Sequence, residues 1–325
     1  MSREDRKLRK HLEERAKRER RLAKKYSKHS DDVSSRHTGP MATGLAVETG
    51  PGFCDVLCGH QRVRCRSAGD AAIGDRVLFS SDRRRIEEVL PRRTVLSRAD
   101  PGNPHLQRII AVNVDVVVNV VSLKSPPLRP GLIDRYLIAT GRSGADPLLC
   151  VNKIDLLENP EELDQLRPYQ DADADVPVVL CSAATGEGIA RLSEALAGKL
   201  CVFAGHSGVG KSSLLNALDP RLELTTGAVS EGNDKGRHTT TSSALYHLPG
   251  GAIVIDTPGI REFGLWDVTP AEVRLYYRDF AGYACAFSDC SHSHEPGCGV
   301  KRAVESGEIR EVRYQGYLRI LASLA

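Results

Sequence analysis

The sequence predicts a multidomain α/β protein in which three folded parts follow a charged N-terminal arm. Short alternating apolar stretches between positions 43 and 98, separated by Gly, Asp and Pro, predict a small β-barrel. From 114 to 256, apolar strand candidates alternate with helical patterns, which indicates a parallel sheet covered by helices. A Cys/His cluster between 285 and 298, flanked by helical patterns, predicts a small, mostly helical metal-binding domain.

The composition is that of a soluble protein of several domains, with 325 residues, 41% hydrophobic and 27% charged. The longest apolar run, VDVVVNVV, is too short to span a membrane. The N-terminus lacks the apolar core of a signal peptide. We therefore expect a cytoplasmic protein with no membrane partner, and we expect a monomer. The nine cysteines are an odd number, which favours metal binding over a disulfide framework.

Residues 1–40 are expected to form a basic, flexible arm and linker. Positions 3–28 hold thirteen Lys or Arg and five Asp or Glu, a net charge of +8, whereas the whole chain carries only +3. This helix-prone stretch has almost no apolar face and cannot pack as core, so it suits binding to nucleic acid phosphates. A solvated extension without a partner is the alternative.

Residues 41–100 favour a closed β-barrel of the OB type, because no helical period of useful length appears there. Such barrels bind oligonucleotides, and eight arginines support an RNA-binding role. They are Arg62, Arg64, Arg66, Arg83, Arg84, Arg85, Arg92 and Arg93. The alternative is a structural barrel whose basic face is only solvated.

The stretch VFAGHSGVGKSSLLNAL, residues 202–218, contains a phosphate-binding loop between a strand and a helix. It fits G-x-x-x-x-G-K-[ST], in which glycines let backbone N–H groups converge on phosphate oxygens. Lys211 is placed to reach the β- and γ-phosphates, as part of the catalytic machinery, and the Ser212 hydroxyl to ligate Mg²⁺. The residues expected to contact the nucleotide here are Gly205, His206, Ser207, Gly208, Val209, Gly210, Lys211, Ser212 and Ser213.

Two further stretches specify guanine. In CVNKID, residues 150–155, Asp155 can accept two hydrogen bonds from the guanine N1–H and N2 amine, a donor pair that adenine lacks. Asn152 can meet the O6/N7 side of the base, and the stem of Lys153 can cover the ring. A third strand ends at Ser182 and Ala183, whose backbone would approach O6. The nucleotide is therefore expected to be GTP or GDP.

Two more motifs belong to the parts of a GTPase that respond to the γ-phosphate. In AIVIDTPG, Asp256 would reach Mg²⁺ through water, and the Gly259 N–H would meet the γ-phosphate. In GRHTTT, residues 236–241, a threonine would close on Mg²⁺. We favour Thr240, and Thr239 remains an alternative.

The order of the motifs is unusual and predicts a circularly permuted GTPase domain over 101–264. An ordinary GTPase has the phosphate-binding loop (P-loop) first, then the two switches, then N-K-x-D and the Ser-Ala pair (S-A). Here N-K-x-D and S-A (Ser182 and Ala183) precede the P-loop. Strand candidates lie at 114–122, 147–151, 176–181, 200–204, 242–248 and 252–256. Helical patterns lie near 129–141, 159–168 and 187–197.

The C-terminal part, 265–325, contains the stretch CAFSDCSHSHEPGC. Cys285, Cys290, His292 and Cys298 fit C-x4-C-x-H-x5-C, and three thiolates with one imidazole suit tetrahedral Zn²⁺. Four protein ligands close the coordination shell, so the metal is expected to be structural. His294 is an alternative to His292.

The blocks GDRV, VLPR, SGVGKSSLLNAL, HTTT, DTPGIREFGLW and EPGC, over residues 43–320, resemble the ribosome small-subunit-dependent GTPase A family. The resemblance implies a cytoplasmic GTPase that binds the small ribosomal subunit and its ribosomal RNA near the decoding region. It implies a role in late maturation, with hydrolysis stimulated by the ribosome. It also favours His292 over His294 as a zinc ligand.

The catalytic residue is less directly indicated. Many GTPases orient the attacking water with a glutamine after D-x-x-G, but Ile260 stands there and cannot bond water. His238, beside the switch threonines, is the internal candidate, and the resemblance points to it as well. The alternative is that His238 packs or contacts RNA and the ribosome supplies the group. Gly208 stands where potassium-activated GTPases place an asparagine, so potassium activation has no support here.

Two other functions stay open at this point. The chain could be an RNA-binding module switched by GTP, with incidental hydrolysis, and ribosome-stimulated turnover would distinguish it from an enzyme. It could also be a permuted GTPase of large-subunit assembly, although that class usually lacks this barrel and zinc domain.

Overall fold

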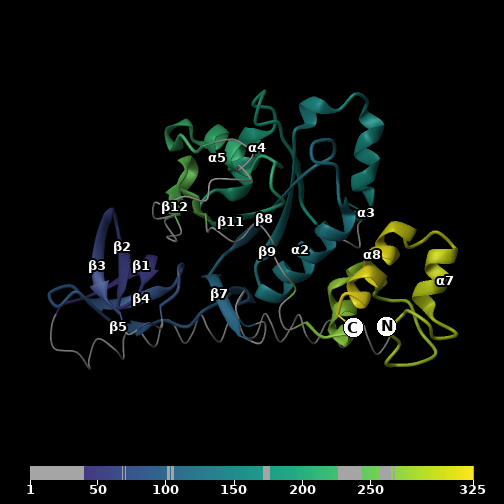
Figure 1. Cartoon of the computed structure of the whole chain (residues 1–325), viewed down its shortest axis with the longest axis horizontal. Coiled ribbons are helices and arrows are strands. Elements are labelled where there is room, and N and C mark those ends of the chain that lie inside the picture. Colours follow the sequence, from purple (N-terminus) through teal and green to yellow (C-terminus); the bar gives the residue numbers. More distant parts are fainter. Residues whose placement is uncertain are drawn as a thin grey trace.

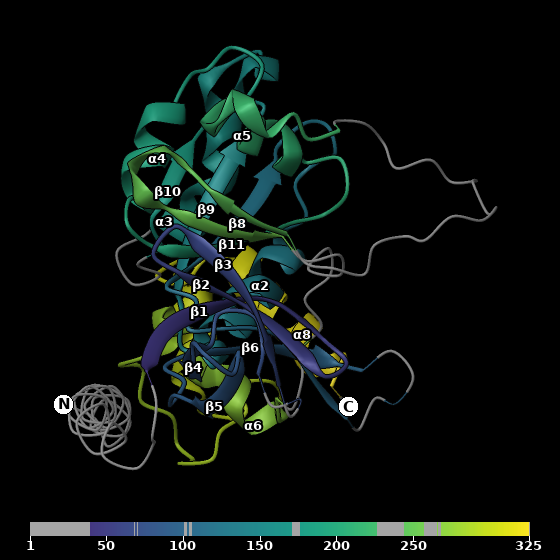
Figure 2. The ribbon, with the colours of Figure 1, turned by 90° about the vertical axis from the view of Figure 1, so that its left-hand side faces the viewer.

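The computed structural model describes residues 40–324, except 68, 70, 101, 102, 104, 105, 171–175, 226–243, 257–264, 266 and 267. Three parts follow one another along the longest axis: a barrel, a central sheet with helices, and a C-terminal helical part (Figure 1). Figure 2, seen from the barrel side, shows the barrel in front of the C-terminal helices and below the central sheet. No helix among the described residues has the length and apolarity that crossing a membrane requires.

The N-terminal part is a closed five-stranded barrel with the strand order β1-β2-β3-β5-β4, which confirms the predicted OB-type barrel. The long strand β1 closes it by pairing antiparallel with both β2 and β4. Its interior is filled by a buried cluster that includes Ala46, Val56 and Phe79. The strands are β1 Met41–Gly50, β2 Phe53–Cys58, β3 Gln61–Arg66, β4 Arg76–Ser80 and β5 Arg85–Val89.

A two-stranded ribbon, β6 Val95–Ala99 and β7 Gln107–Val112, joins the barrel to the sheet. Residues 41–100 were expected to form the barrel, but their last strand, β6, pairs with β7 and not with a barrel strand. Asn113 fixes this joint: its side chain accepts from the Arg93 N–H at 2.8 Å and donates to the Gly74 carbonyl at 2.9 Å. Gly74 has φ +92°, and a Cβ there would collide with the Val112 carbonyl, so only glycine allows this approach.

The central sheet has six strands in the order β10-β9-β8-β11-β13-β12. The expected parallel arrangement holds for all neighbours except β12, which pairs antiparallel with β13. The short connection of 248–252 explains the exception, because a parallel pair would need a long crossover. The strands are β8 Val116–Ser122, β9 Asp146–Asn152, β10 Val178–Leu180, β11 Leu200–Ala204, β12 Ala244–His247 and β13 Ile253–Asp256.

Helices cover both faces of this sheet. Leu192 of α4 and Leu214 of α5 pack in one cluster with Val118, and Tyr136 of α2 packs in another with Val117. The helix expected near 159–168 is instead a 3-10 helix that continues into α3; Pro168 lacks an N–H, which interrupts the α-helical bonding. The elements are α2 Pro130–Ser143, η1 Ile154–Leu156, η2 Pro160–Leu166, α3 Arg167–Gln170, α4 Ile189–Leu196, α5 Lys211–Leu218, η3 Pro220–Leu222 and η4 Pro249–Gly251.

The C-terminal part is helical, as predicted, and its core includes a residue of the central domain. Aromatic rings of Tyr277, Phe280 and Tyr317 pack with centroids 5.0–5.2 Å apart. Ile138 of α2 belongs to the same buried cluster, so this domain folds against α2. The elements are α6 Pro270–Val273, η5 Arg274–Tyr276, η6 Arg278–Phe280, α7 Gly299–Glu305 and α8 Glu311–Ala322.

The joint between barrel and sheet generates a stability prediction. Asn113→Ala removes two hydrogen bonds at a buried site, and we expect it to lower the free energy of unfolding by about 1–3 kcal/mol. Gln107→Ala, an exposed change on β7, is the control and should stay within about 0.5 kcal/mol of wild type. Urea denaturation measures both. Equal values for the two variants would contradict the assigned role of Asn113.

Candidate functional site

Three loops meet at the carboxyl edge of the central sheet. One follows β11 and contains Gly205–Gly210, one follows β9 and contains Asn152–Asp155, and one follows β10 and contains Ser182 and Ala183. Because β9, β10 and β11 run parallel, their loops end at the same edge, where open α/β sheets bind ligands. The loops after β9 and β10 and the helix that follows the Gly205–Gly210 loop line a cavity of about 560 Å³, formed by Asn152, Lys153, Asp155, Leu156, Ala183, Ala184, Ser213, Asn216 and Ala217.

Asn152 connects two of these loops. Its buried side chain donates to the Val209 carbonyl at 2.9 Å and accepts from the Ala183 N–H at 3.1 Å. The amide that was expected to meet the base therefore also holds the P-loop to the S-A loop, and it keeps one N–H that can still face a ligand. Gly210 permits this contact, because a Cβ there would collide with the Asn152 amide.

Lys153 braces the P-loop from a second direction. Its backbone has φ +66°, and its ammonium donates to the carbonyls of Ser125 at 2.5 Å and Gly208 at 2.7 Å. These bonds stretch the side chain along the cavity that it lines. The stem is thus held by the protein in a fixed position, as a residue that covers a base requires.

Asp155 lies exposed at the cavity, where one of its carboxylate oxygens accepts from the Ser182 hydroxyl. Ser182 is buried, and its oxygen in turn accepts from the Thr185 N–H at 3.1 Å. This chain of hydrogen bonds orients the carboxylate. The acceptor sites that remain can take a pair of donors from a ligand.

The P-loop leads directly into α5, whose first turn carries Lys211, Ser212 and Ser213. The Lys211 ammonium donates to the carbonyls of Gly205 at 2.7 Å and His206 at 3.0 Å, so it lies across the mouth of the loop. Backbone N–H groups and the helix N-terminus there favour phosphate. The arrangement can bind a phosphorylated ligand, with Ser212 available to a divalent cation.

Several predicted site residues lie outside the described residues. They are His238, Thr239, Thr240 and Gly259. Asp256 is the last residue of β13, which pairs with β11, so its backbone ends at the same edge of the sheet as the P-loop.

Asn216 lines the cavity and was not singled out from the sequence. Its side-chain amide donates to the Leu224 carbonyl and accepts from the Leu224 N–H, both at 2.8 Å. These two hydrogen bonds hold Leu224 against α5, two residues before the stretch 226–243 that lies outside the described residues. A signal was present in the sequence, because Asn216 follows Ser212 by four positions and therefore shares its face of the helix.

The second site is the Cys/His cluster in the C-terminal domain. One ligand atom from each of Cys285, Cys290, His292 and Cys298 lies within 4.8 Å of the others, so these residues could hold a metal ion. The His292 Nδ1 lies 3.5 Å from the sulfurs of Cys285 and Cys298. His294 is outside this group, and its Nδ1 contacts the Ser293 hydroxyl at 3.0 Å.

The chemistry of this cluster suits a soft divalent cation. Burial lowers the pKa of His292 to about 4, so its imidazole is neutral and able to ligate at pH 7. Burial raises the pKa of Cys290 to about 12, so this thiol needs a cation to ionise at neutral pH. The N–H of Gly299 donates to the Cys285 sulfur at 3.3 Å, which stabilises a thiolate there.

Fold and site together define a circularly permuted P-loop GTPase that follows an OB-like barrel and precedes a Cys/His helical domain. The chain belongs to the RsgA GTPase family, because the sequence model of that family matches residues 89–266. It is 42% identical over 315 residues to the small ribosomal subunit biogenesis GTPase RsgA of Chlorobaculum parvum, covering 90% of this chain and 97% of that relative. It is 45% identical over 247 residues to RsgA 1 of Vibrio vulnificus strain YJ016, covering 74% of this chain and 68% of that relative.

Solved structures agree with this placement. YjeQ from Thermotoga maritima is similar with a TM-score of 0.72 and 33% identity, covering 88% of this chain and 99% of that one. YloQ, described as a circularly permuted GTPase, is similar with a TM-score of 0.68 and 29% identity, covering 89% and 96%. The predictions of fold class, permuted order and GTP hydrolase are therefore confirmed.

The geometry of Asp155 generates a specificity prediction. Asp155→Asn replaces an acceptor with an amide donor, so we expect the preference for GTP over ATP to fall at least about 10²-fold. Competition of GTP and ATP for a fluorescent guanine nucleotide measures it. Asp164→Asn makes the same change on an exposed residue outside the cavity and should keep the preference. An unchanged preference in Asp155→Asn would remove Asp155 from base recognition.

Proposed function

We propose that the chain is a GTPase that binds the small ribosomal subunit and acts in its late maturation, with GTP hydrolysis stimulated by the ribosome. The observation that carries the proposal is the side chain of Asn152, which holds the N-K-x-D loop to the phosphate-binding loop and to the S-A loop beside the cavity. The small-subunit assignment is supported by relatives named small ribosomal subunit biogenesis GTPase at 38–45% identity.

In this proposal each part of the nucleotide site has one task. Asp155 reads the guanine edge, Lys153 covers the base, and Lys211 contacts the β- and γ-phosphates. Ser212 and Thr240 would ligate Mg²⁺, which neutralises charge that develops on the phosphates. The sequence places Asp256 and Gly259 at the γ-phosphate end.

The proposed RNA contact lies on the barrel. The ion pairs of the barrel arginines reduce the number of candidates for this contact. Arg62 and Arg64 are bonded to Asp55, and Arg92 to Asp75. By contrast, the exposed Arg66, Arg83 and Arg84 have no ion-pair partner among the described residues. Arg66 and Arg84 are also neighbours, because the Arg66 N–H donates to the Arg84 carbonyl at 2.7 Å. These three side chains are the best placed for RNA phosphates.

We further propose one structural Zn²⁺ in the Cys/His cluster, Mg²⁺ bound with GTP, and a cytoplasmic monomer. Three thiols and one imidazole leave no open position for a reactive water, which supports a structural rather than catalytic metal.

Co-sedimentation with purified ribosomal subunits tests the partner. We expect the protein to pellet with small subunits in the presence of a non-hydrolysable GTP analogue, less with GDP, and not with large subunits. Equal or stronger recovery with large subunits would contradict the proposal.

The metal assignment predicts about one zinc per chain. Cys290→Ser should release this zinc and loosen the C-terminal domain, whereas GTP binding should largely survive because the cavity lies elsewhere. Cys58→Ser, a barrel thiol outside the cluster, is the control. Elemental analysis of freshly purified protein measures the metal, and a wild-type preparation without zinc would overturn the assignment.

The catalytic assignment predicts different defects for two variants. His238→Ala should keep GTP binding and GTP-dependent association with small subunits but lose about 10²–10⁴-fold of the stimulated rate. Lys211→Ala should instead weaken nucleotide binding, because it removes a phosphate contact.

Single-turnover hydrolysis with saturating small subunits measures both variants. His247→Ala, an exposed histidine on β12, is the matched control and should behave as wild type. Near-normal stimulated hydrolysis in His238→Ala would mean that the ribosome supplies the catalytic group.

A further inference from the structure

A buried arginine joins the C-terminal domain to the GTPase domain. Arg313 of α8 is only 4% exposed. Its Nη1 donates to Asp134 of α2, while its Nε and Nη2 donate to both carboxylate oxygens of Asp279 at 3.0 and 3.1 Å. We call Arg313, Asp134 and Asp279 the Arg313 cluster. It connects an element of the central domain to two elements of the C-terminal domain through one guanidinium.

Aromatic rings and a glycine complete the surroundings of this cluster. The guanidinium carbon lies 4.6 Å from the ring centroid of Tyr277 and 5.2 Å from that of Tyr169 in α3. Gly316 lets α8 approach α2, because a Cβ there would collide with the Asp134 carboxylate. The contacts therefore depend on the planar shape and fixed length of arginine, which lysine does not reproduce.

The two carboxylates of this cluster share one cation. Asp134 is 1% exposed, and both carboxylates raise the pKa of Arg313 although burial alone would lower it. Burial raises the pKa of Asp134 to about 7, although the nearby cations Arg313 and Arg319 lower it. Removing Arg313 leaves two carboxylates without their shared cation, whereas replacing all three members with uncharged groups leaves no buried charge.

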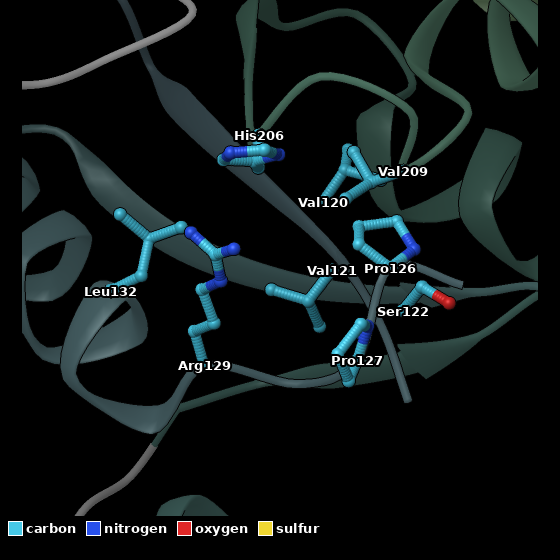
Figure 3. A pocket seen from close by; sticks show the side chains of 9 residues that line it. All are labelled: Val120, Val121, Ser122, Pro126, Pro127, Arg129, Leu132, His206 and Val209. Carbon is cyan, nitrogen blue, oxygen red and sulfur yellow. The ribbon is translucent and has the colours of Figure 1, made fainter. Parts of the chain in front are cut away.

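The helix α2 extends from this cluster to the P-loop. Its first turn helps line a small niche behind the P-loop, formed by Val120, Val121, Ser122, Pro126, Pro127, Arg129, Leu132, His206 and Val209 (Figure 3). Leu132 of α2 is two residues from Asp134, and Val209 is the residue whose carbonyl Asn152 holds. The first turns of α2 thus carry both a member of the Arg313 cluster and a wall of the niche next to the P-loop.

The other end of α2 is also bound to the C-terminal domain, at the surface. Arg142 forms an ion pair with Glu272 at 3.6 Å, and Gly141 lies against the Tyr276 ring. The Arg142 pair has side chains 30% and 39% exposed, so solvent screens it, unlike the Arg313 cluster. It offers a matched control at the same domain boundary.

We propose that Arg313 is a positioning residue for GTP hydrolysis. Through Asp134 it fixes α2 between the C-terminal domain and the P-loop niche, so that the position of the C-terminal domain is transmitted to the phosphate-binding loop. Coupling of this kind is reciprocal, so nucleotide binding must also affect the C-terminal domain. This coupling rests on the GTPase activity proposed above but needs no ribosomal partner.

Arg313→Lys tests the proposal kinetically, because it keeps the charge but cannot bond both carboxylates with the same geometry. At saturating GTP without ribosomes, we expect its single-turnover rate to fall at least 5-fold. The affinity for GDP should change less than about 2-fold, because Asn152 and Lys153 still hold the P-loop. Arg142→Lys should match wild type in both the single-turnover rate and the affinity for GDP. A folded Arg313→Lys variant with the wild-type rate would overturn the proposal.

If Arg313→Lys does not fold, a triple variant tests the proposal instead. It combines Asp134→Leu, Asp279→Asn and Arg313→Met, and it removes every buried charge of the cluster. We expect it to fold and to hydrolyse GTP at least 5-fold more slowly; the wild-type rate in it would overturn the proposal.

Wild-type protein provides a test that needs no variant. Hydrogen exchange of the α8 amides should slow when a non-hydrolysable GTP analogue binds, and this response should be absent in Arg313→Lys or the triple variant. The proposal would be overturned if the wild-type α8 amides exchanged at the same rate with and without the analogue.

Discussion

The nucleotide site depends on the side-chain amide of Asn152, which ties the P-loop to the S-A loop. Its partners, the Val209 carbonyl and the Ala183 N–H, belong to loops after different strands of one parallel sheet. Such bonds depend on where the strands end and not on the order in which the chain visits them. Circular permutation therefore keeps the site intact, and Lys153 adds a second brace to the P-loop through Gly208.

Permutation changes what the site is connected to. After β13 the chain passes through D-x-x-G and enters the C-terminal domain directly. That domain also shares its core with α2 through Ile138 and binds α2 through Arg313. The C-terminal domain is thus joined to the nucleotide site twice, once by the chain and once by a helix. This arrangement suits an enzyme in which a bound partner and the nucleotide influence each other.

Local motifs made most of the site predictable, and contacts between distant segments made the rest unpredictable. The P-loop, N-K-x-D and the cysteine spacing each carry their chemistry within a few residues, so the sequence was enough to place them. Arg313 and Asp134 are 179 positions apart, and a charged residue on a helix is ordinarily a surface residue. The antiparallel pairs β6–β7 and β12–β13 did have a local signal, because short connections join their strands, but the alternation of strands and helices along this region favoured a parallel sheet.

This chain is a GTP hydrolase, and we propose that the small ribosomal subunit completes its active state. Steady-state GTP turnover by the wild-type protein, measured alone, with isolated small subunits and with isolated large subunits, tests it most directly. We expect slow turnover alone, strong acceleration by small subunits and little effect of large subunits. Turnover that is the same in all three conditions would contradict the claim.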